Sequence, residues 1–572
     1  MPIHNADIAR LFDRIADLLE LAGENPFRVR AYRNASRMLS GLGKNVRDML
    51  AKGEDLTELP GIGDDLAGKI REAVETGSVD LLRRLEKKLP AGLPSLLALP
   101  GLGPKRVRML YDQLHVSSVE ELARAAEQGK LEGLPGLGPK TVAKIVAAIA
   151  TKRTEERRYL VSEARPIAED LVAHLSKARG LSEIVVAGSY RRGKETVGDL
   201  DVLVAAKGKT HVVERFVGYD EVVEVLARGD TRAAVRLRSG IQVDLRLVPE
   251  ESFGAALHYF TGSKAHNVAV RKRAQERGLK LNEYGVFLGE ERIAGETEAS
   301  VFEAVGLPFV PPELREDRGE LEAAAKGKLP ELVKLEDLRG DLHVHTKATD
   351  GHATLGEMVA AAKEAGLSYL AVTEHSQRLK MVHGLDPDRL LAQVDAIAEL
   401  NGSLKGFTVL AGIEVDVLED GTLDLPDSVL SRLDLVVASV HGKFDLPREA
   451  QTKRILRAIE NRHVSILGHP TGRLLLSREA YDFDVERVFA AAAEAGVVLE
   501  INAHPERLDL SDVHCRQAKE LGARFAISTD AHSTSDFANL GYGVAQARRG
   551  WLEASDVVNT LPVAKLKKAL AR

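Results

Sequence analysis

Three aspartates and a glycine-serine turn form the first set of residues that could do chemistry. Asp199 and Asp201 lie two residues apart in the apolar run DLDVLVA, shortly after Gly188 and Ser189 of GSYRRG. Residues i and i+2 of a strand share one face, and Asp244 of IQVDLRLV can join them from a neighbouring strand. Three carboxylates hold two Mg²⁺ or Mn²⁺ ions for phosphoryl transfer. A lone Asp-x-Asp pair would be a solvated face, but the turn and the third acid favour a nucleotidyl-transfer site.

A second set of ligand-type residues lies at the ends of apolar segments in the last part of the chain. Its nine members are His343, His345, Asp350, His375, Glu414, His441, His469, Asp530 and His532. A mixed set of imidazoles and carboxylates accommodates two or three Mn²⁺, Zn²⁺ or Fe²⁺ ions. A single buried histidine is more often a core residue, but packing does not explain this spacing. The remaining segment ends in Glu500 and Asn502, which we expect to give supporting hydrogen bonds.

A third pattern repeats in the first third of the chain: LPGIGDDLAGKI (59–70), LPGLGPKRVRML (99–110) and LPGLGPKTVAKI (134–145). In each copy Leu-Pro ends a helix, Gly-x-Gly makes a turn, and an apolar-periodic segment begins the next helix. Backbone N–H groups at such a helix start bind phosphate without reading bases. One copy could serve packing alone, whereas three favour DNA binding, with a monovalent cation as a further possible ligand. The predicted DNA contacts are Gly61, Gly63, Gly101, Gly103, Gly136, Gly138, Lys105 and Lys140.

The elements that must position these residues differ along the chain. Short helices occupy the first third, and alternating apolar runs from Ile184 to Val248 predict one small sheet. The prolines and mixed charge of PFVPPELREDRGELE predict a boundary and a linker. Seven apolar strands then alternate with helical segments, which is typical of a parallel α/β barrel with function at the strand C-termini. These strands are predicted at 341–345, 369–375, 409–415, 435–441, 464–470, 497–503 and 524–532.

Composition limits the class of protein. A chain of 572 residues with 44% hydrophobic and 29% charged residues is too long for one core. The one cysteine, Cys515, excludes a disulfide framework, and neither a signal peptide nor a membrane span is visible. We therefore expect a cytoplasmic, nucleoid-associated protein. The net charge of −6 neither proves nor excludes DNA binding, which must depend on local basic patches and backbone donors.

The segment GSYRRGKETVGDLDVLV (188–204) resembles the motif of family X DNA polymerases. This resemblance implies that Asp199, Asp201 and Asp244 are catalytic metal ligands, and that Gly188, Ser189 and Arg192 bind the incoming triphosphate. YFTGS (259–263) is similar to a further element of the family, so Tyr259, Phe260 and Gly262 would contact the nucleotide, and Asn282 the new base pair. Gln242 stands where family members often have arginine, which the resemblance leaves without an assigned consequence.

The two ends of the chain extend the resemblance. NPFRVRAYRNASRML (25–39) with LPGIGDDLAGKI resembles the small lyase domain of the same family, and Lys69 falls at the position of its Schiff-base lysine. Asp65 stands where lysine is usual, so the lyase activity is left open. HVH, TDG, TEH, GIEVD, SVH, GHP and TDAH, over residues 340–572, resemble the polymerase-and-histidinol-phosphatase (PHP) family with all nine ligands present. This implies a metal-dependent 3′→5′ exonuclease, a nuclease at abasic sites, or a trimmer of blocked 3′ ends.

We therefore predict a multidomain α/β enzyme with helical helix-hairpin-helix domains, a nucleotidyltransferase α+β palm and a distorted seven-stranded PHP barrel. Its substrates would be gapped or nicked double-stranded DNA and deoxynucleoside triphosphates. We expect the protein to be a monomer and not to bind a membrane. Two alternatives are a small-molecule phosphatase with a decayed nucleotidyltransferase and a non-catalytic DNA-end scaffold. The predicted divisions are a lyase-like domain at 1–80, a second helical domain at 81–152, a palm at 153–250, a nucleotide-selecting subdomain at 251–316, a linker at 317–338 and a PHP domain at 339–572.

Overall fold

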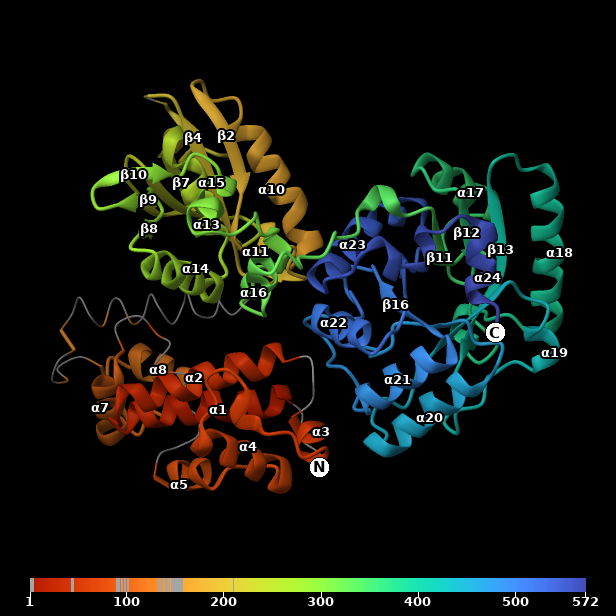
Figure 1. Cartoon of the computed structure of the whole chain (residues 1–572), viewed down its shortest axis with the longest axis horizontal. Helices are drawn as coiled ribbons and strands as arrows, with labels where there is room; N and C mark the ends of the chain where they lie inside the picture. Colours follow the sequence, from red (N-terminus) through yellow and green to blue (C-terminus); the bar gives the residue numbers. More distant parts are fainter. Residues whose placement is uncertain are drawn as a thin grey trace. The chain divides into compact units, whose positions relative to one another are not determined.

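The computed structural model describes two compact units, one up to Arg157 and one from Arg158 to Arg572 (Figure 1). The described residues are 5–42, 46–88, 93, 96, 99, 102–131, 134, 137, 138, 142, 145, 158–208 and 210–572. Among them, no helix combines the length and the apolar character needed to cross a bilayer.

The first unit is helical. Along its first helix Ile8, Phe12, Ile15 and Leu19 recur every three or four residues and are buried, which places one face of the helix in the core. Asn25 caps the second helix by accepting a hydrogen bond from the Phe27 amide. The helices are α1 (Asn5–Leu21), α2 (Pro26–Gly41), α3 (Val46–Ala51), α4 (Asp64–Thr76), α5 (Asp80–Lys88), α7 (Pro104–Leu114) and α8 (Val119–Glu127).

The second unit begins with the predicted small sheet, of five strands in the order β2-β4-β7-β6-β5. The alternating runs around the Ser-Gly turn are the antiparallel pair β6 and β7, as the sequence predicts. Strand β4 pairs with β7 in parallel, which joins the two segments that carry the aspartates. The elements are β1 (Tyr159–Leu160), α10 (Val161–Leu175), β2 (Leu181–Val186), α11 (Gly188–Arg191), β3 (Thr196–Val197), β4 (Asp199–Ala206), α12 (Val212–Val217), β5 (Val222–Arg228), β6 (Arg232–Leu237) and β7 (Gln242–Pro249).

A smaller α+β segment follows, with the three-stranded antiparallel sheet β10-β9-β8. Within 317–338, which the sequence predicts to be a linker, a short helix begins at the buried Glu320, so this stretch is packed rather than extended. The elements are α13 (Phe253–Thr261), α14 (Lys264–Glu276), β8 (Lys280–Asn282), β9 (Gly285–Leu288), β10 (Glu291–Ala294), α15 (Glu298–Ala304) and α16 (Glu320–Ala325).

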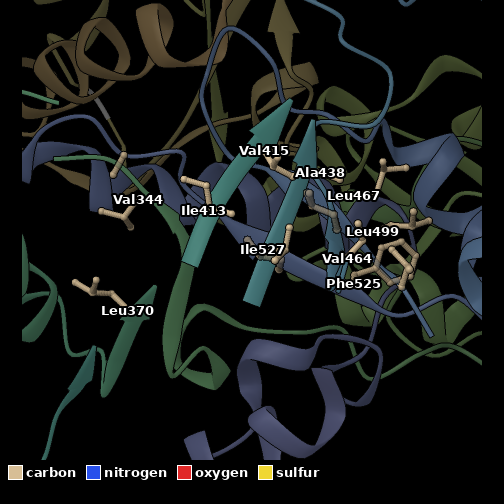
Figure 2. Packing of buried hydrophobic residues seen from close by; sticks show 14 of the residues in the cluster. Val344, Leu370, Ile413, Val415, Ala438, Val464, Leu467, Leu499, Phe525 and Ile527 are labelled. Carbon is tan, nitrogen blue, oxygen red and sulfur yellow. The ribbon is translucent and has the colours of Figure 1, made fainter. Parts of the chain in front are cut away.

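The last part is the predicted barrel: seven strands that pair in parallel and in chain order. The bridge between Val344 and Ala531 brings the first and last strands together, so the barrel is nearly closed. Buried aliphatic side chains such as Ile413, Leu499 and Ile527 fill the layer against the helices (Figure 2). The strands are β11 (Gly340–Val344), β12 (Tyr369–Val372), β13 (Thr408–Asp416), β14 (Leu435–Ser439), β15 (Ile466–Leu467), β16 (Val498–Asn502) and β17 (Phe525–Ser528). The helices are α17 (Leu355–Glu364), α18 (Pro387–Ser403), α19 (Asp427–Leu430), α20 (Arg448–Glu460), α21 (Val485–Ala495), α22 (Asp512–Glu520), α23 (Leu540–Arg549) and α24 (Val563–Leu570).

Candidate active sites

The parallel pairing of β4 with β7 brings the three aspartates together. Asp201 lies directly opposite Asp244 in this register, and Asp199 opposes Gln242. Burial raises the pKa of Asp201 to about 7, with the charges of Asp199 and Asp244 adding to the effect. Like-charged carboxylates this close need a cation, and an all-oxygen donor set suits Mg²⁺ or Mn²⁺. The residues present therefore fit divalent ions.

The turn before these strands lies against them. The Ala187 amide donates to the Asp201 carbonyl at 2.7 Å, and this places Gly188 at the start of α11. Gly188 has a φ of 61°, and a Cβ there would collide with the Asp201 carboxylate. Only glycine fits both the backbone conformation and the space, so the turn is held close to the aspartates.

The turn also meets the YFTGS segment. The Arg191 guanidinium donates to Thr261 Oγ1 at 2.7 Å, and that of Arg192 donates to the Thr261 carbonyl at 2.5 Å. Gly262 ends α13 beside Arg192, and the rings of Tyr259 and Phe260 are 5.1 Å apart. The structure thus brings Arg192 beside Gly262, and α11, which begins with Gly188 and Ser189, against α13.

Two further predicted positions have other contacts. Asn282 ends β8, where its side chain accepts from the Tyr284 amide at 2.9 Å instead of contacting the turn. Gln242 Nε2 donates to Asp244 Oδ2 at 2.7 Å, so this residue orients one carboxylate oxygen of the aspartate group.

The nine ligand-type residues of the barrel lie near the C-terminal ends of its strands or in the loops that follow them. Their potential ligand atoms form three groups, each within 4.8 Å: His345, Asp350, His375 and His532; His343, His345 and Asp530; and His375, Glu414 and His441. The ninth residue, His469, lies with Nε2 at 2.9 Å from Glu414 Oε1. The barrel therefore assembles the whole predicted set.

Glu414 is the centre of this cluster. Its carboxylate oxygens lie 2.7 Å from His375 Nδ1, 3.1 Å from His441 Nε2 and 3.5 Å from His343 Nε2. Burial alone would raise the pKa of Glu414, but the surrounding histidines, His441 and His375 foremost, hold it well below its ordinary range.

Unsatisfied polar atoms test whether this cluster fits metal ions. Buried atoms without a hydrogen bond include His343 Nε2, both ring nitrogens of His345, Asp350 Oδ1, Glu414 Oε2 and His469 Nδ1. Such atoms are costly unless an ion satisfies them. Burial, with the neighbouring His375, lowers the pKa of His345 to about 3, which keeps it neutral as a ligand must be. The donor set fits two or three transition-metal ions.

In the first unit, Gly63 and Gly103 are the N-caps of α4 and α7, and neither helix start has a side-chain cap. A Cβ at Gly61, Gly63, Gly103 or Gly138 would meet nothing within 4 Å, which leaves room for a phosphate. Gly101, Gly136 and Lys140 lie outside the described residues, and of Lys105 only its place in α7 is described. Lys69 is 15% exposed and forms an ion pair with Asp65, one turn before it.

Five known domain models match successive parts of the chain. They are a helix-hairpin-helix domain (3–79), a SAM-like helix-hairpin-helix tandem (93–151), the DNA polymerase beta palm (160–235), the DNA polymerase beta thumb (256–316) and a PHP domain (341–504). The chain is 39% identical to the DNA polymerase/3′-5′ exonuclease PolX of Bacillus subtilis over the full length of both proteins. The chain belongs to the PolX family. It is a family X DNA polymerase with a PHP-domain 3′-5′ exonuclease, and it depends on divalent metal ions.

Shorter relatives of this PolX-family chain match less of it. A probable phosphatase of Thermoanaerobacter sp. is 32% identical over 40% of this chain and 93% of its own length. A probable phosphatase of Photobacterium profundum is 34% identical over 35% of this chain and 80% of its own length. The full-length match to PolX supports the polymerase prediction over the phosphatase alternative.

In this PolX-family chain, carboxylates behind the candidate ligand residues of the PHP domain orient their side chains. His343 Nδ1 donates to Glu500 at 2.7 Å, and Glu500 also accepts from the His469 amide at 2.6 Å. His441 Nδ1 donates to Asp416 at 3.2 Å. The sequence predicts the supporting role of Glu500 but not that of Asp416. The same i, i+2 spacing rule could have found Asp416, because it follows Glu414 on one strand.

Two other residues support the sites, although the sequence around them gives a weak indication of that role or none. Glu374, next to His375, is buried and accepts from the hydroxyls of Thr346 and Thr349 in the loop that leads to Asp350. In the polymerase half, Glu316 accepts a hydrogen bond of 3.0 Å from Arg192 Nε, although these residues are far apart in sequence. Nothing in the sequence around Glu316 marks this contact.

Proposed function

We propose that this enzyme fills short gaps in DNA during base-excision or break repair, and that Asp199, Asp201 and Asp244 are its polymerase metal ligands. The observation that carries the proposal is the register that sets Asp201 opposite Asp244, with Asp199 on the same strand. When bound, the two ions would assist attack by the primer 3′-hydroxyl and departure of diphosphate. The strands β4 and β7 fix where the three carboxylates meet. This arrangement would align the primer end with the carboxylates and the ions that they would hold, for transfer of one nucleotide at a time.

The turn and the YFTGS segment would hold the nucleotide. The amides of Gly188 and Ser189 at the start of α11, with Arg192, form the triphosphate contact. Tyr259 is 36% exposed, so its ring can lie under the sugar of a deoxynucleoside triphosphate together with Phe260. Gly262 allows the nucleotide to approach, and Asn282 would contact the edge of the new base pair.

The barrel site would hydrolyse phosphodiesters at DNA ends. Nine ligands, His343, His345, Asp350, His375, Glu414, His441, His469, Asp530 and His532, would hold two or three ions, with Mn²⁺ first and Zn²⁺ or Fe²⁺ as alternatives. When bound, these ions would supply a nucleophile and stabilise the leaving oxygen. Glu500 and Asp416 fix the ring orientations of His343 and His441. This site could also cleave DNA at abasic sites and trim blocked 3′ ends.

The helix-hairpin-helix turns would grip the DNA backbone. The open helix starts at Gly63 and Gly103 offer amides to phosphates on either side of a gap, and a monovalent cation could join them. Lys69 would act as a lyase only if it were released from Asp65, because a paired ammonium is a poor nucleophile.

The test is extension and shortening of a labelled primer on a one-nucleotide-gapped duplex with Mn²⁺. Asp244→Ala should abolish extension and retain shortening, whereas His343→Ala should do the reverse. A wild-type enzyme that does neither, yet hydrolyses a small phosphate ester, would support the phosphatase alternative. An Asp199→Ala/Asp201→Ala protein with unchanged activity and DNA binding would support a scaffold.

A further inference from the structure

The turn that we assign to the triphosphate also contacts its neighbouring domains. Arg191 forms an ion pair with Glu298 at 2.6 Å, and Arg192 and Lys194 contact Glu316 at 3.0 and 3.4 Å. These two glutamates belong to the segment that follows the palm. The polar side chains from Arg191 to Lys194 are therefore occupied by domain contacts.

The PHP domain holds the same turn from another direction. Arg549, at the end of α23, donates to the Arg192 carbonyl at 2.9 Å and to Glu316 at 3.1 Å. Its other terminal nitrogen donates to Asp512 at 2.5 Å. The Arg549 side chain is only 2% exposed, so these contacts are made away from solvent.

Two further contacts bring the PHP domain against the turn. Arg473 forms two hydrogen bonds with Glu195, at 2.8 and 3.2 Å. Gly193 has a φ of 65°, and a Cβ there would lie 3.3 Å from Ala545 Cβ on α23. The turn is thus packed closely against α23 as well as bonded to it.

The positive charges around Glu316 stabilise its ionised form. Burial would raise the pKa of Glu316, but Lys194, Arg549 and Arg192 outweigh it and lower the pKa to about 2. Glu316 is therefore a carboxylate at neutral pH and orients the Arg192 guanidinium. Arg549 fixes Glu316 and the Arg192 backbone together, since one guanidinium bonds both.

We propose that Arg549 of the PHP domain is a positioning residue for the polymerase reaction, which holds Arg192 and its turn in the geometry that binds the deoxynucleoside triphosphate. This inference rests on the proposed role of the turn. Arg549 touches neither β4 nor β7, which carry the aspartates, so its loss should weaken triphosphate binding more than the chemical step. A buried partner left unpaired also makes the loss larger than that of a surface ion pair.

The test is single-nucleotide gap filling by full-length Arg549→Met, with kcat and the KM for the deoxynucleoside triphosphate measured separately. We expect the KM to rise about tenfold, with kcat changed less than about threefold and exonuclease activity retained. Arg549→Lys should have a KM between those of wild type and Arg549→Met, because an ammonium can still donate to the Arg192 carbonyl. A KM within about twofold of wild type for Arg549→Met would overturn the inference.

Arg548→Met is the matched control. Arg548 is the preceding residue of α23 and joins the same domains through Glu313, at 2.6 Å, and the Val333 carbonyl, at 3.0 Å, without contacting the turn. Its KM should remain at the wild-type value. An equal rise in KM for both variants would mean that Arg549 acts only by holding the domains together, and would overturn its positioning role.

Two more variants separate the possible failures. If Arg192→Ala leaves the KM unchanged, the proposed role of the turn fails; if Arg192→Ala raises it and Arg549→Met does not, only the positioning inference fails. If Arg549→Met loses both activities and its thermal transition, Glu195→Gln becomes the deciding variant. It weakens the contact with Arg473 while keeping a side chain of similar size. A raised KM for Glu195→Gln supports PHP positioning of the turn, and an unchanged one overturns it.

Discussion

The two active sites differ in the types of side chain that they bring together. The polymerase site gathers three carboxylates, and Asp201, buried beside two others, has its pKa raised to about 7. The PHP site interleaves six histidines with three acids, and its histidines hold the pKa of Glu414 low. The first site therefore gathers like charges that need cations for balance, whereas the second mixes acids with imidazoles, which bind metal ions as neutral ligands. A preassembled site should lose most when its central residue is changed.

The largest effect is expected for Glu414→Gln, because this carboxylate contacts several histidines at once. Exonuclease activity should fall at least about a thousandfold, with extension kept within about twofold. The measurement is primer shortening and gap filling in the same preparation. Glu419→Gln, a change at an exposed acid near the same strand, is the control, and an equal loss there would contradict the central role of Glu414.

A smaller effect is expected for Glu500→Gln, which weakens the orientation of His343 and of the His469 backbone. Loss of such a supporting carboxylate costs about ten- to a hundredfold in metal affinity or activity. A titration of exonuclease activity with Mn²⁺ should shift to higher concentration, with activity partly recovered at saturation. The exposed Glu494→Gln should leave the titration unchanged. A Glu500→Gln curve that overlays wild type would show that the ligands need no such support.

The polymerase site offers the matching test at Gln242, which donates to Asp244 at 2.7 Å. Gln242→Ala should lower the extension rate by about three- to tenfold, as expected for the loss of one hydrogen bond of ordinary strength. Exonuclease activity in the same samples is the internal control. An unchanged rate would mean that the metal ions alone orient Asp244, and would sharpen the contrast with the PHP site.

The smallest effect is expected at Lys69. Because Asp65 neutralises it, Lys69→Ala should change gap filling by less than about twofold, the size expected for an ion pair with one solvent-exposed partner. Borohydride trapping on DNA with a 5′-deoxyribose phosphate measures the lyase step itself. Asp65→Ala should increase the trapped fraction, and Lys69→Ala should remove the increase. Efficient trapping by wild type would show that Asp65 does not suppress Lys69.

Much of both sites could be predicted because local periodicity determines it. The i, i+2 spacing of Asp199 and Asp201 and the apolar rhythm of the barrel strands state which residues share a face or a strand end. The partners of Arg192 could not be predicted in this way. Glu316 is separated from it by 124 residues and Arg549 by 357, and packing of whole domains sets such contacts.

The order of the chain has a consequence for synthesis on the ribosome. Asp199, Asp201 and Asp244 all precede the barrel, whereas the barrel closes only when Ala531 reaches Val344. Domains fold as they emerge, from the N-terminus onward. A nascent chain thus presents the polymerase aspartates before it can complete the exonuclease, and before Arg549 reaches the turn. A chain that terminates early would carry the acids for adding nucleotides without the site for removing them.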